Sequence, residues 1–372
     1  MKILILIQCT NLGGMEQATL PLVQQLLGMG FEVEVLSLNP VGEMGRLLDK
    51  EGVPVHGFEY RGIFGWRSFS NVRNALRASD ADSLIMVGHN LMAMLALGNR
   101  WHGKRILFLH FHHQGVMPRL LWKLIYLLAG IQFNVVIFPS AFISAEAIDI
   151  APWIRRKSQV LRSPVHLFGI TSASDRLQAR KRLGLSEKCS YVGNAGWLIK
   201  RKRWDVFLDV AASVSAEVPD VRFLIAGDGP ERESLEKLAN NLGISERIHW
   251  MGWQKNLNDF YQSLDVLLFN SEWDAMGRTP LEAMARGIPV VASVLNGGLG
   301  EIIDDPSIGM LLESHDVFRL ASEIVAILND PDRARSYAVS GYKRIEEVGS
   351  AKAHAHQVLS LLGLPLPTSP VP

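Results

Sequence analysis

The amino-acid sequence alternates short apolar runs with longer mixed segments, and this alternation sets the class of fold. In the first half the apolar runs cover residues 2–7, 32–38, 83–87, 105–109 and 135–138. Each run has sequence of helical length before or after it, such as residues 16–27. Continuous apolar strands separated by such segments are typical of a parallel sheet that is covered on both faces.

The same pattern starts again after residues 162–166. Apolar runs at residues 190–195, 222–226, 247–251, 265–269 and 289–292 are separated by segments with helical spacing, including 203–215 and 231–242. Two consecutive α/β blocks of this kind predict two doubly wound domains that face one another, joined by a linker over residues 164–175. Ligands of such sheets bind at the carboxyl ends of the strands, so we expect the functional site in a cleft between the domains.

Composition narrows the class of protein. A chain of 372 residues with 48% hydrophobic residues and a net charge of +1 can bury a core in each of two domains and is not expected to be disordered. Cys9 and Cys189 are its two cysteines, which argues against a disulfide framework or a zinc site built on cysteine and indicates a reducing compartment. The apolar N-terminus lacks a cleavage site of small residues, so we interpret it as a first strand and not as a signal peptide.

Charge is distributed unevenly, with a basic segment in the first half. Residues 60–166 hold 13 basic and four acidic side chains. Within this segment, residues 117–133 are mostly apolar but are interrupted by Arg119 and Lys123, and they are too short for a spanning helix, which needs ~20 apolar residues. Two interpretations remain: a core helix with snorkelling cationic stems, or a helix on an anionic membrane leaflet into which Trp122 and Leu121 dip. With a pI of about 7.9 and no recognised motif, we expect no nucleic-acid partner.

The most informative segment covers residues 270–292. In it Asp274 and Glu282 flank the predicted start of a helix, after a strand that ends at residue 269. We expect Thr279 as the N-cap, Pro280 at the first helical position and a stop at Gly287. The N–H groups at such a helix start favour a phosphate, and the two carboxylates can accept hydrogen bonds from sugar hydroxyls. The same arrangement also serves structural roles, so the residues by themselves leave both interpretations open.

This segment resembles the signature of the retaining glycosyltransferases of family 4, in which two acidic residues separated by seven others precede an Ala-Met-Ala-x-Gly-x-Pro-Val-Val-Ala run. The acidic pair is here Asp274 and Glu282, with Asp in place of the usual first Glu. The similarity extends over nearly the whole chain and implies the α/β GT-B fold, two Rossmann-like doubly wound parallel-sheet domains that face each other across a deep cleft. The implied parts are an acceptor-side domain over residues 1–168, a nucleotide-sugar donor domain over 169–345, a helix near 346–362 that packs back on the first domain, and a disordered tail over 363–372.

Glycine-rich and basic motifs match the same family in the expected order. Residues 11–16 resemble the loop in which Gly13 and Gly14 let the backbone approach the donor's diphosphate, although a tight strand-to-helix turn also needs glycine. Residues 196–205 resemble a Gly-Arg…Lys diphosphate clamp: Lys202 aligns with the Lys, Trp197 stands where Arg is usual, and Arg201 or Arg203 is the candidate substitute. A solvated charged loop is the alternative interpretation of these cations. The resemblance assigns further donor-binding positions to Gly196, Gly227, Gly277, Arg278, Thr279, Gly297 and Gly298.

Three histidines follow the strand predicted at residues 105–109. A His just after this strand faces the donor sugar in family members, and both His110 and His112 are eligible, since in an extended segment they point to the same side and His113 to the other. The cluster also raises the alternative of a metal site. Because no acidic partner lies nearby in sequence and this fold class generally works without a bound metal, we expect neither a metal nor a cofactor.

The resemblance implies that a sugar leaves a nucleotide-diphosphate donor with its anomeric configuration kept. Lys202, a neighbouring Arg and the Gly14 N–H would meet the charge of the departing diphosphate. Glu282 would hold the ribose hydroxyls, Asp274 the sugar hydroxyls, and His110 or His112 would orient the sugar.

The expected partners are a nucleotide sugar, a glycan or lipid-linked acceptor of lipopolysaccharide or other cell-envelope polysaccharide synthesis, and the anionic inner face of the plasma membrane, which places the protein in the cytoplasm. A nucleotide-sugar 2-epimerase of the same fold and a non-catalytic sugar-nucleotide-binding protein are the alternatives. A Rossmann dehydrogenase is disfavoured because Gly13 and Gly14 lack the G-x-G-x-x-G spacing.

Overall fold

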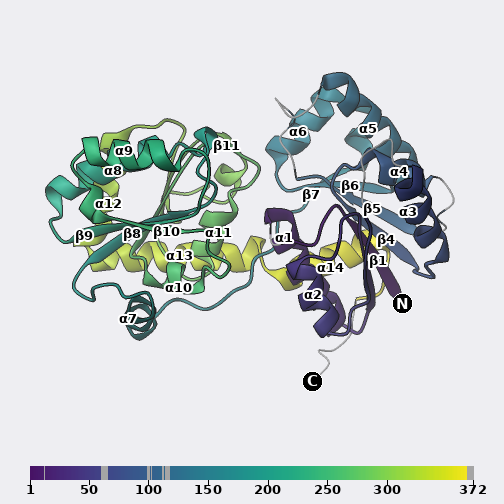
Figure 1. Ribbon diagram of the computed structural model, residues 1–372, viewed down its shortest axis with the longest axis horizontal. Helices are drawn as coiled ribbons and strands as arrows, with labels where there is room; N and C mark the ends of the chain where they lie inside the picture. Colours follow the sequence, from purple (N-terminus) through teal and green to yellow (C-terminus); the bar gives the residue numbers. More distant parts are fainter. Residues whose placement is uncertain are drawn as a thin grey trace. The chain divides into compact units, whose positions relative to one another are not determined.

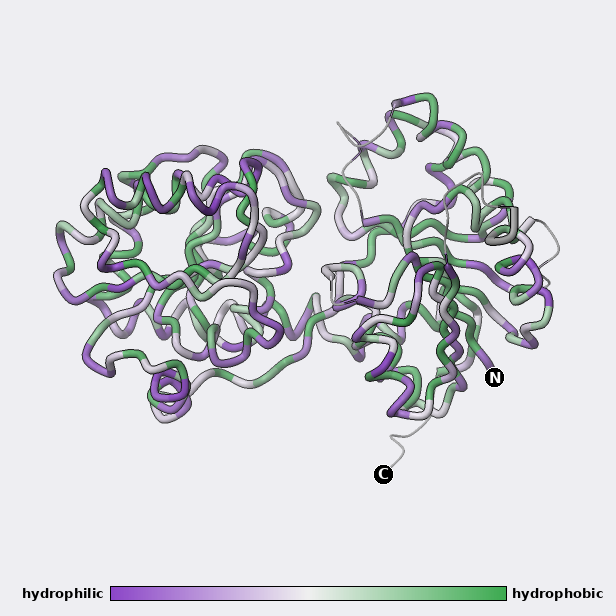
Figure 2. The backbone as a smooth tube through the Cα atoms, viewed as in Figure 1, coloured by the Kyte–Doolittle hydropathy of each residue, from purple (hydrophilic) through white to green (hydrophobic). Residues whose placement is uncertain are grey.

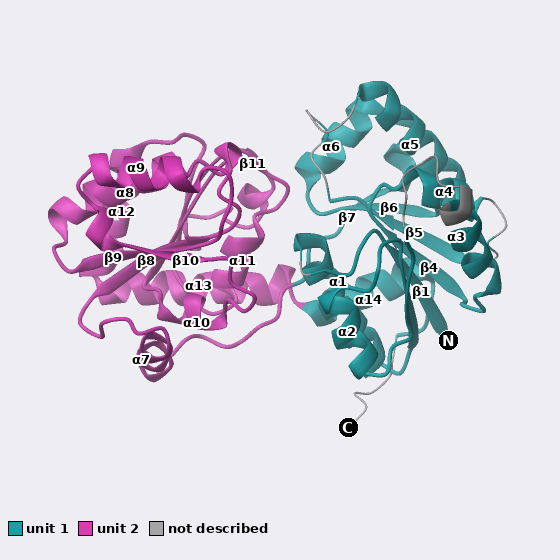
Figure 3. Ribbon diagram, viewed as in Figure 1, with its two compact units in different colours: residues 1–164, 351–372 teal, residues 165–350 magenta. Residues whose placement is uncertain are grey.

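The computed structural model describes residues 1–11, 13–59, 66–98, 101, 103–110, 113 and 118–366, with only the backbone of 66–68. These residues form two compact units (Figure 3). Unit 1 comprises Met1–Pro164 and Ala351–Pro372, and unit 2 comprises Val165–Ser350. Of the tail predicted over residues 363–372, residues 367–372 lie outside the described part of the chain.

Unit 1 is built on a parallel sheet of seven strands in the order β3-β2-β1-β4-β5-β6-β7. The strands are β1 (Lys2–Ile7), β2 (Glu32–Ser37), β3 (Val55–Gly57), β4 (Ser83–Val87), β5 (Lys104–Phe108), β6 (Val135–Phe138) and β7 (Ser158–Val160). The helices are α1 (Gly14–Gly28), α2 (Glu43–Lys50), α3 (Trp66–Ala78), α4 (Leu91–Leu97), α5 (Arg119–Gln132), α6 (Ala141–Ile150), α14 (Ala351–Leu362) and the 3-10 helix η1 (Pro152–Lys157).

Unit 2 repeats the plan with six parallel strands in the order β10-β9-β8-β11-β12-β13. The strands are β8 (Ser190–Ala195), β9 (Val221–Ala226), β10 (Ile248–Gly252), β11 (Val266–Asp274), β12 (Val290–Gly297) and β13 (Met310–Leu312). The helices are α7 (Ala173–Arg182), α8 (Trp204–Glu217), α9 (Arg232–Asn241), α10 (Asn258–Ser263), α11 (Arg278–Met284), α12 (Val317–Asn329), α13 (Pro331–Val348) and the 3-10 helices η2 (Lys200–Lys202), η3 (Ser245–Arg247) and η4 (Leu299–Glu301).

Helices cover both faces of each sheet, as the uninterrupted apolar strands require. In unit 1 the odd positions of β1 pack with α1, α2 and α14, and Figure 1 shows α3 to α6 on the other face. In unit 2 one face packs with α8, α9 and α12 and the other with α10, α11 and the end of α13. The strands of both sheets are apolar along most of their length (Figure 2). The prediction of an α/β chain with two doubly wound parallel sheets is confirmed.

Strand boundaries differ from the predicted ones at the sheet edges and at the signature segment. The edge strands β3, β7 and β13 were not predicted, because three residues are too few to show an apolar period. The predicted strand end at residue 269 is wrong: β11 continues to Asp274, paired with β12 as far as Gly297. Strand β11 therefore carries the polar residues of the signature up to Asp274 in extended backbone, and Glu282 lies on α11.

Helix α5 buries one side of the apolar segment that the sequence left open. Trp122 is 1% exposed and packs against the rings of His113 and Tyr126, and Leu121 is half-buried. The interpretation in which Trp122 dips into a membrane is therefore wrong, because that side chain belongs to the core of unit 1. None of the helices in the described part of the chain is both long and apolar enough to span a bilayer.

The C-terminal helix α14 belongs to unit 1, where it packs against α1 and β5. Its His354 is buried, donates from Nδ1 to the carbonyl of Arg162 at 2.9 Å and stacks on Phe108. Burial, with a smaller contribution from His110, lowers the pKa of His354 from 6.5 to about 4 although the bond to Arg162 opposes the shift. The helix is therefore held with a neutral imidazole.

We expect unit 1 to lose stability as the pH falls from 6.5 towards 4. In this window the unfolded chain protonates His354 and the folded one does not, so the free energy of unfolding falls by up to about 3 kcal/mol at the low end. Denaturant unfolding of the wild type and of His354→Gln at pH 7 and pH 5 measures this contribution. If the free energy of unfolding fell equally in the two proteins between pH 7 and pH 5, a group other than His354 would control the pH dependence.

Candidate functional site

The carboxyl ends of β8 and β11 lie side by side in the centre of the unit 2 sheet. The strand order reverses at this pair, and such switch points are where open α/β sheets bind ligands. The turn after β8 leads to η2, which carries Arg201 and Lys202, and β11 ends at Asp274. The topology thus brings together side chains that are 72 positions apart in the sequence.

Lys202 and Asp274 form an ion pair that is largely shielded from solvent. The Lys202 ammonium donates to Asp274 Oδ2, and the side chains are 17% and 16% exposed. Asp274 Oδ1 accepts the Gly277 N–H at 2.9 Å. Burial alone would raise the pKa of the Asp274 carboxyl, but Lys202, Arg201 and the Gly277 N–H outweigh it and hold that pKa below its usual range. Asp274 is therefore a fixed anion at neutral pH.

Arg201 is the second cation at this carboxylate. Its Nη1 lies 3.9 Å from Asp274 Oδ2 and donates to the Trp273 carbonyl at 3.0 Å, and its guanidinium stacks 4.1 Å from the Trp273 ring centroid. Arg203, the other candidate, is bound by Asp205 through contacts of 2.8 to 3.1 Å. The sequence suggested either Arg201 or Arg203 as a substitute for the missing clamp Arg. In the structure Arg201 lies near Asp274, whereas Arg203 binds Asp205.

Glu282 is held by two donors on α11 and α10. Arg278 Nε lies 2.7 Å from Glu282 Oε1, and the Tyr261 hydroxyl donates to Glu282 Oε2 at 2.8 Å. Burial and the adjacent Glu282 raise the pKa of Tyr261 well above its usual value, so the phenol stays protonated and donates. A carboxylate oxygen has room for a second donor, so Glu282 can still accept a bond from a ligand hydroxyl.

The start of α11 differs from the prediction. The helix begins at Arg278, its N-cap is Gly277 at φ 78°, and Pro280 is its third residue. Thr279 is not the cap, because its hydroxyl donates to the Ala195 carbonyl at the end of β8. Glycine is needed at 277 because the turn passes through the left-handed region while its N–H binds Asp274.

Two of the predicted glycines let backbone segments touch. A Cβ at Gly227 would lie 1.9 Å from the Gly196 carbonyl oxygen, and one at Gly297 would lie 2.1 Å from that of Asp274. The Gly298 N–H donates to the same Asp274 carbonyl at 3.2 Å. These glycines pack the β9 and β12 loops against the ends of β8 and β11, which is a structural reason for glycine at each position.

Two family models cover almost the whole chain. The one described as Glycosyltransferase Family 4 matches residues 12–167, and the one described as Glycosyl transferases group 1 matches residues 175–344. The chain belongs to the family 4 glycosyltransferases. Its fold is that of HepE from Anabaena, solved in complex with UDP and glucose, with a TM-score of 0.83 and 20% identity over 98% of this chain and 99% of that one.

Two curated relatives are similar in sequence to about half of this chain. The lipopolysaccharide core biosynthesis mannosyltransferase LpsB of Rhizobium meliloti is 29% identical over 195 residues, which are 50% of this chain and 55% of LpsB. The N-acetyl-alpha-D-glucosaminyl L-malate synthase of Bacillus anthracis is 32% identical over 162 residues, 44% of this chain and 42% of that protein. The chain thus spans about half the length of these relatives.

The remaining family motif residues belong to unit 1. Gly13 precedes α1, and a Cβ there would lie 2.6 Å from Glu16 Oε2, whereas a Cβ at Gly14 would meet nothing within 4 Å. A side chain at position 13 would displace the Glu16 carboxylate, whereas one at position 14 would have room. His110 lies just beyond β5 and stacks on Phe108, and His112 lies outside the described residues.

His113 has a structural position in unit 1. It is 4% exposed, contacts the Tyr126 hydroxyl through Nε2, and its Nδ1 lies 3.3 Å from Glu146 Oε2. Within the described residues, no three side chains of the His, Cys, Asp and Glu types are arranged to hold a metal ion. The described part of the histidine cluster is thus packed with Glu146 and aromatic rings.

The sequence missed two aromatic groups at this edge of unit 2. Tyr261 gave no signal, because its apolar neighbours mark a core position and only the fold shows its hydroxyl on Glu282. Trp197 was noted only as a departure from the clamp. It is 57% exposed and packs against Trp253, which follows β10, with ring centroids 4.8 Å apart. An exposed pair of indoles offers a surface on which a planar ring can stack.

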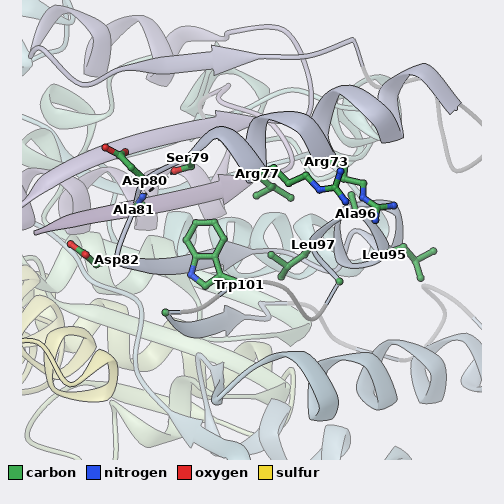
Figure 4. A pocket seen from close by; sticks show the side chains of 13 residues that line it. Arg73, Arg77, Ser79, Asp80, Ala81, Asp82, Leu95, Ala96, Leu97 and Trp101 are labelled. Carbon is green, nitrogen blue, oxygen red and sulfur yellow. Dashed lines mark hydrogen bonds between the residues drawn. The ribbon is translucent and has the colours of Figure 1, made fainter.

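A separate pocket of about 600 Å³ lies at the amino ends of β4 and β5 in unit 1 (Figure 4). Arg73, Arg77 and Trp101 are among its lining residues, and Asp80 and Asp82 on its rim bind the Lys2 side chain and backbone N–H. None of the described residues that line this pocket is among the donor-binding or catalytic residues predicted from the sequence. Since doubly wound sheets bind ligands at the carboxyl ends of their strands, this pocket is not the expected donor site.

Proposed function

We propose that this chain is a retaining glycosyltransferase that moves a sugar from a nucleotide-diphosphate sugar to a glycan or lipid-linked acceptor. The observation that carries the proposal is the cluster of Lys202, Arg201 and Asp274 at the switch point of unit 2, directly ahead in the chain of helix α11, which carries Glu282. Similarity to LpsB supports an acceptor in lipopolysaccharide or other cell-envelope polysaccharide synthesis, and similarity to HepE supports a nucleotide-sugar donor.

Charge at this site suits a departing diphosphate. Arg201 and Lys202 are two cations at the single carboxylate of Asp274, so these three side chains together carry a net positive charge. In our proposal Lys202 turns from Asp274 to the diphosphate as the bond to the sugar breaks, with Arg201 beside it. Asp274, released from part of its ion pair, then accepts the sugar hydroxyls, and Glu282 accepts those of the ribose.

The residues of unit 1 enter the proposal through the family motif. Gly14 would offer its N–H to the diphosphate, and His110 or His112 would orient the sugar. No group among these residues is assigned as a covalent nucleophile, so the acceptor would attack on the side from which the diphosphate leaves. The proposal places the protein in the cytoplasm, with unit 1 in contact with the anionic inner face of the plasma membrane.

The direct test is a screen of purified protein against nucleotide sugars for release of the free nucleoside diphosphate, because donor hydrolysis needs no knowledge of the acceptor. Hydrolysis of one donor well above the others supports the transferase. An isomerised nucleotide sugar would instead indicate a 2-epimerase, and binding without turnover would indicate a non-catalytic protein.

We expect the reaction to proceed without a metal. In our proposal Lys202 and Arg201, which both approach Asp274, take the role that a divalent cation would otherwise have at the leaving group, so dialysis against EDTA should leave donor hydrolysis unchanged. The rate before and after chelation measures this. A rate that disappears with EDTA and returns with Mg²⁺ or Mn²⁺ would contradict the proposed role of the two cations.

We also expect Arg201→Ala to lower kcat/KM for donor hydrolysis by about 10- to 100-fold, since it removes one of two charges that meet the diphosphate. The matched control is Arg203→Ala, two positions away. Arg203 is tied to Asp205 and is the only non-glycine residue with positive φ among those the structure describes. Equal losses in the two variants would show that the assignment of Arg201 is wrong.

A further inference from the structure

Helix α5 exposes a continuous apolar stripe. Leu120, Leu124, Leu127 and Ile131 are 78%, 42%, 49% and 54% exposed. Their spacing of four, three and four residues places them on one side of an α-helix, over a length of about 17 Å. Exposed apolar side chains are usually scattered singly on a protein surface, so a row of this kind marks a contact surface.

The stripe is not the core side of the helix. Trp122, Ile125, Tyr126 and Ala129 form the opposite side and are at most 1% exposed. Helix α5 is therefore mostly apolar, as its colouring in Figure 2 shows, but only one of its two apolar sides is buried in the described part of unit 1.

The neighbouring 3-10 helix η1 adds an exposed indole beside α5. Trp153 is 49% exposed, and its indole N–H donates to the Tyr126 carbonyl of α5 at 3.3 Å. Lys157 fixes η1 to the end of the same helix by donating to the Gly130 and Phe133 carbonyls. We refer to Leu120, Leu124, Leu127, Ile131 and Trp153 together as the α5 surface.

The two helices that form the α5 surface also carry cations. Lys123 on α5 and Arg155 and Arg156 on η1 are exposed, and Arg119 at the start of α5 is bound by Asp149. Residues 118–164 contain six basic and two acidic side chains. Apolar side chains beside unbalanced positive charge are the combination that binds the interface of an anionic bilayer.

The charge also argues against a second copy of the chain as the occupant. Self-association through this surface would bring Lys123, Arg155 and Arg156 of both copies together, and like charges in an interface oppose binding. The helix has 14 residues, fewer than the ~20 that a span needs, so it would lie in the plane of the interface.

We propose that the α5 surface docks unit 1 on an anionic lipid bilayer, with the three leucines, Ile131 and Trp153 inserted among the headgroups and Lys123, Arg155 and Arg156 on lipid phosphates. This inference rests on the proposed function and names the residues that would contact the membrane. The sequence analysis considered Trp122 and Leu121 as the inserted side chains, whereas the structure favours those of the α5 surface. A protein held in this way would meet a lipid-linked acceptor in two dimensions.

The test is sedimentation of the full chain with vesicles that contain neither donor nor acceptor, so its result is independent of donor hydrolysis. The wild type is expected to bind vesicles with about a third phosphatidylglycerol more tightly than pure phosphatidylcholine, and to be released by high salt. Leu124→Ser with Leu127→Ser should lower the partition coefficient at least ~10-fold. Arg155→Gln with Arg156→Gln should lower it by about fivefold per charge.

Matched controls come from α2 of the same unit. The exposed fraction of Leu47, 41%, is nearly the same as that of Leu124, and the neighbouring Arg46 is also exposed. Because neither residue belongs to the α5 surface, the Leu47→Ser and Arg46→Gln variants should bind vesicles as the wild type does. Unchanged thermal unfolding in every variant shows that the fold is kept. Equal binding of the α5 variants and the wild type would overturn the proposal. So would a dimer that the Leu124→Ser and Leu127→Ser changes dissociate, which would assign the surface to a second copy.

Discussion

Replacement of Glu282 by alanine is expected to lower the rate of sugar transfer by at least ~10²-fold, the scale of one lost contact to the transition state. Glu282 is the acidic signature residue whose two oxygens are already oriented, by Arg278 on one and Tyr261 on the other. A carboxylate fixed in this way can bind a ribose diol without a further loss of side-chain entropy. Steady-state kinetics of donor hydrolysis and of transfer measure the effect.

The Tyr261→Phe variant tests how much the orientation of the Glu282 carboxylate contributes, apart from its charge. It removes the hydrogen bond to Glu282 Oε2 and keeps both the ring in the core and the charge, so it should raise KM for the donor about three- to tenfold with kcat little changed. Glu282→Gln keeps the shape but not the charge and should resemble the alanine variant. Near-normal turnover in a folded Glu282→Ala protein would remove Glu282 from the mechanism.

The fold could be predicted from the sequence because the information is local. An apolar run between helical segments fixes a buried parallel strand wherever it occurs, and ten of these runs specify both sheets. The edge strands could not be predicted in the same way, since β3 and β13 have three residues each and owe their conformation to the neighbouring strand.

The site was predictable only in part, because pairing between distant segments is not local. Asp274, Glu282 and Lys202 could be named from the signature, but that Lys202 binds Asp274 depends on the adjacency of β8 and β11. The choice between Arg201 and Arg203 depends on the local backbone: Arg203 follows η2 in the left-handed region and binds Asp205, whereas Arg201 within η2 approaches Asp274. The same limit applies to α5, where the composition indicates an apolar helix but only the packing shows that Trp122 is inside and Leu120 outside.

Replacement of Lys202 by methionine is expected to have the second large effect, a loss of about 10²- to 10³-fold in donor hydrolysis. Methionine keeps most of the apolar stem and removes the ammonium, which lies 4.8 Å from the Phe269 ring centroid and would meet the leaving diphosphate. It also leaves the Asp274 carboxylate with only the more distant Arg201 and the Gly277 N–H. The pKa of Asp274 should then rise from its lowered value, and the thermal stability of the protein should fall.

The effect on stability and the effect on chemistry can be separated with two further variants. Lys202→Met with Asp274→Asn removes both partners of the ion pair, so it should regain thermal stability while donor hydrolysis stays low, because neither group has been restored. Lys200→Met, an exposed cation of the same 3-10 turn, is the matched control and should hydrolyse the donor like the wild type. If the double variant recovered hydrolysis together with stability, Lys202 would serve only to neutralise Asp274, and the diphosphate would have to be met by other groups.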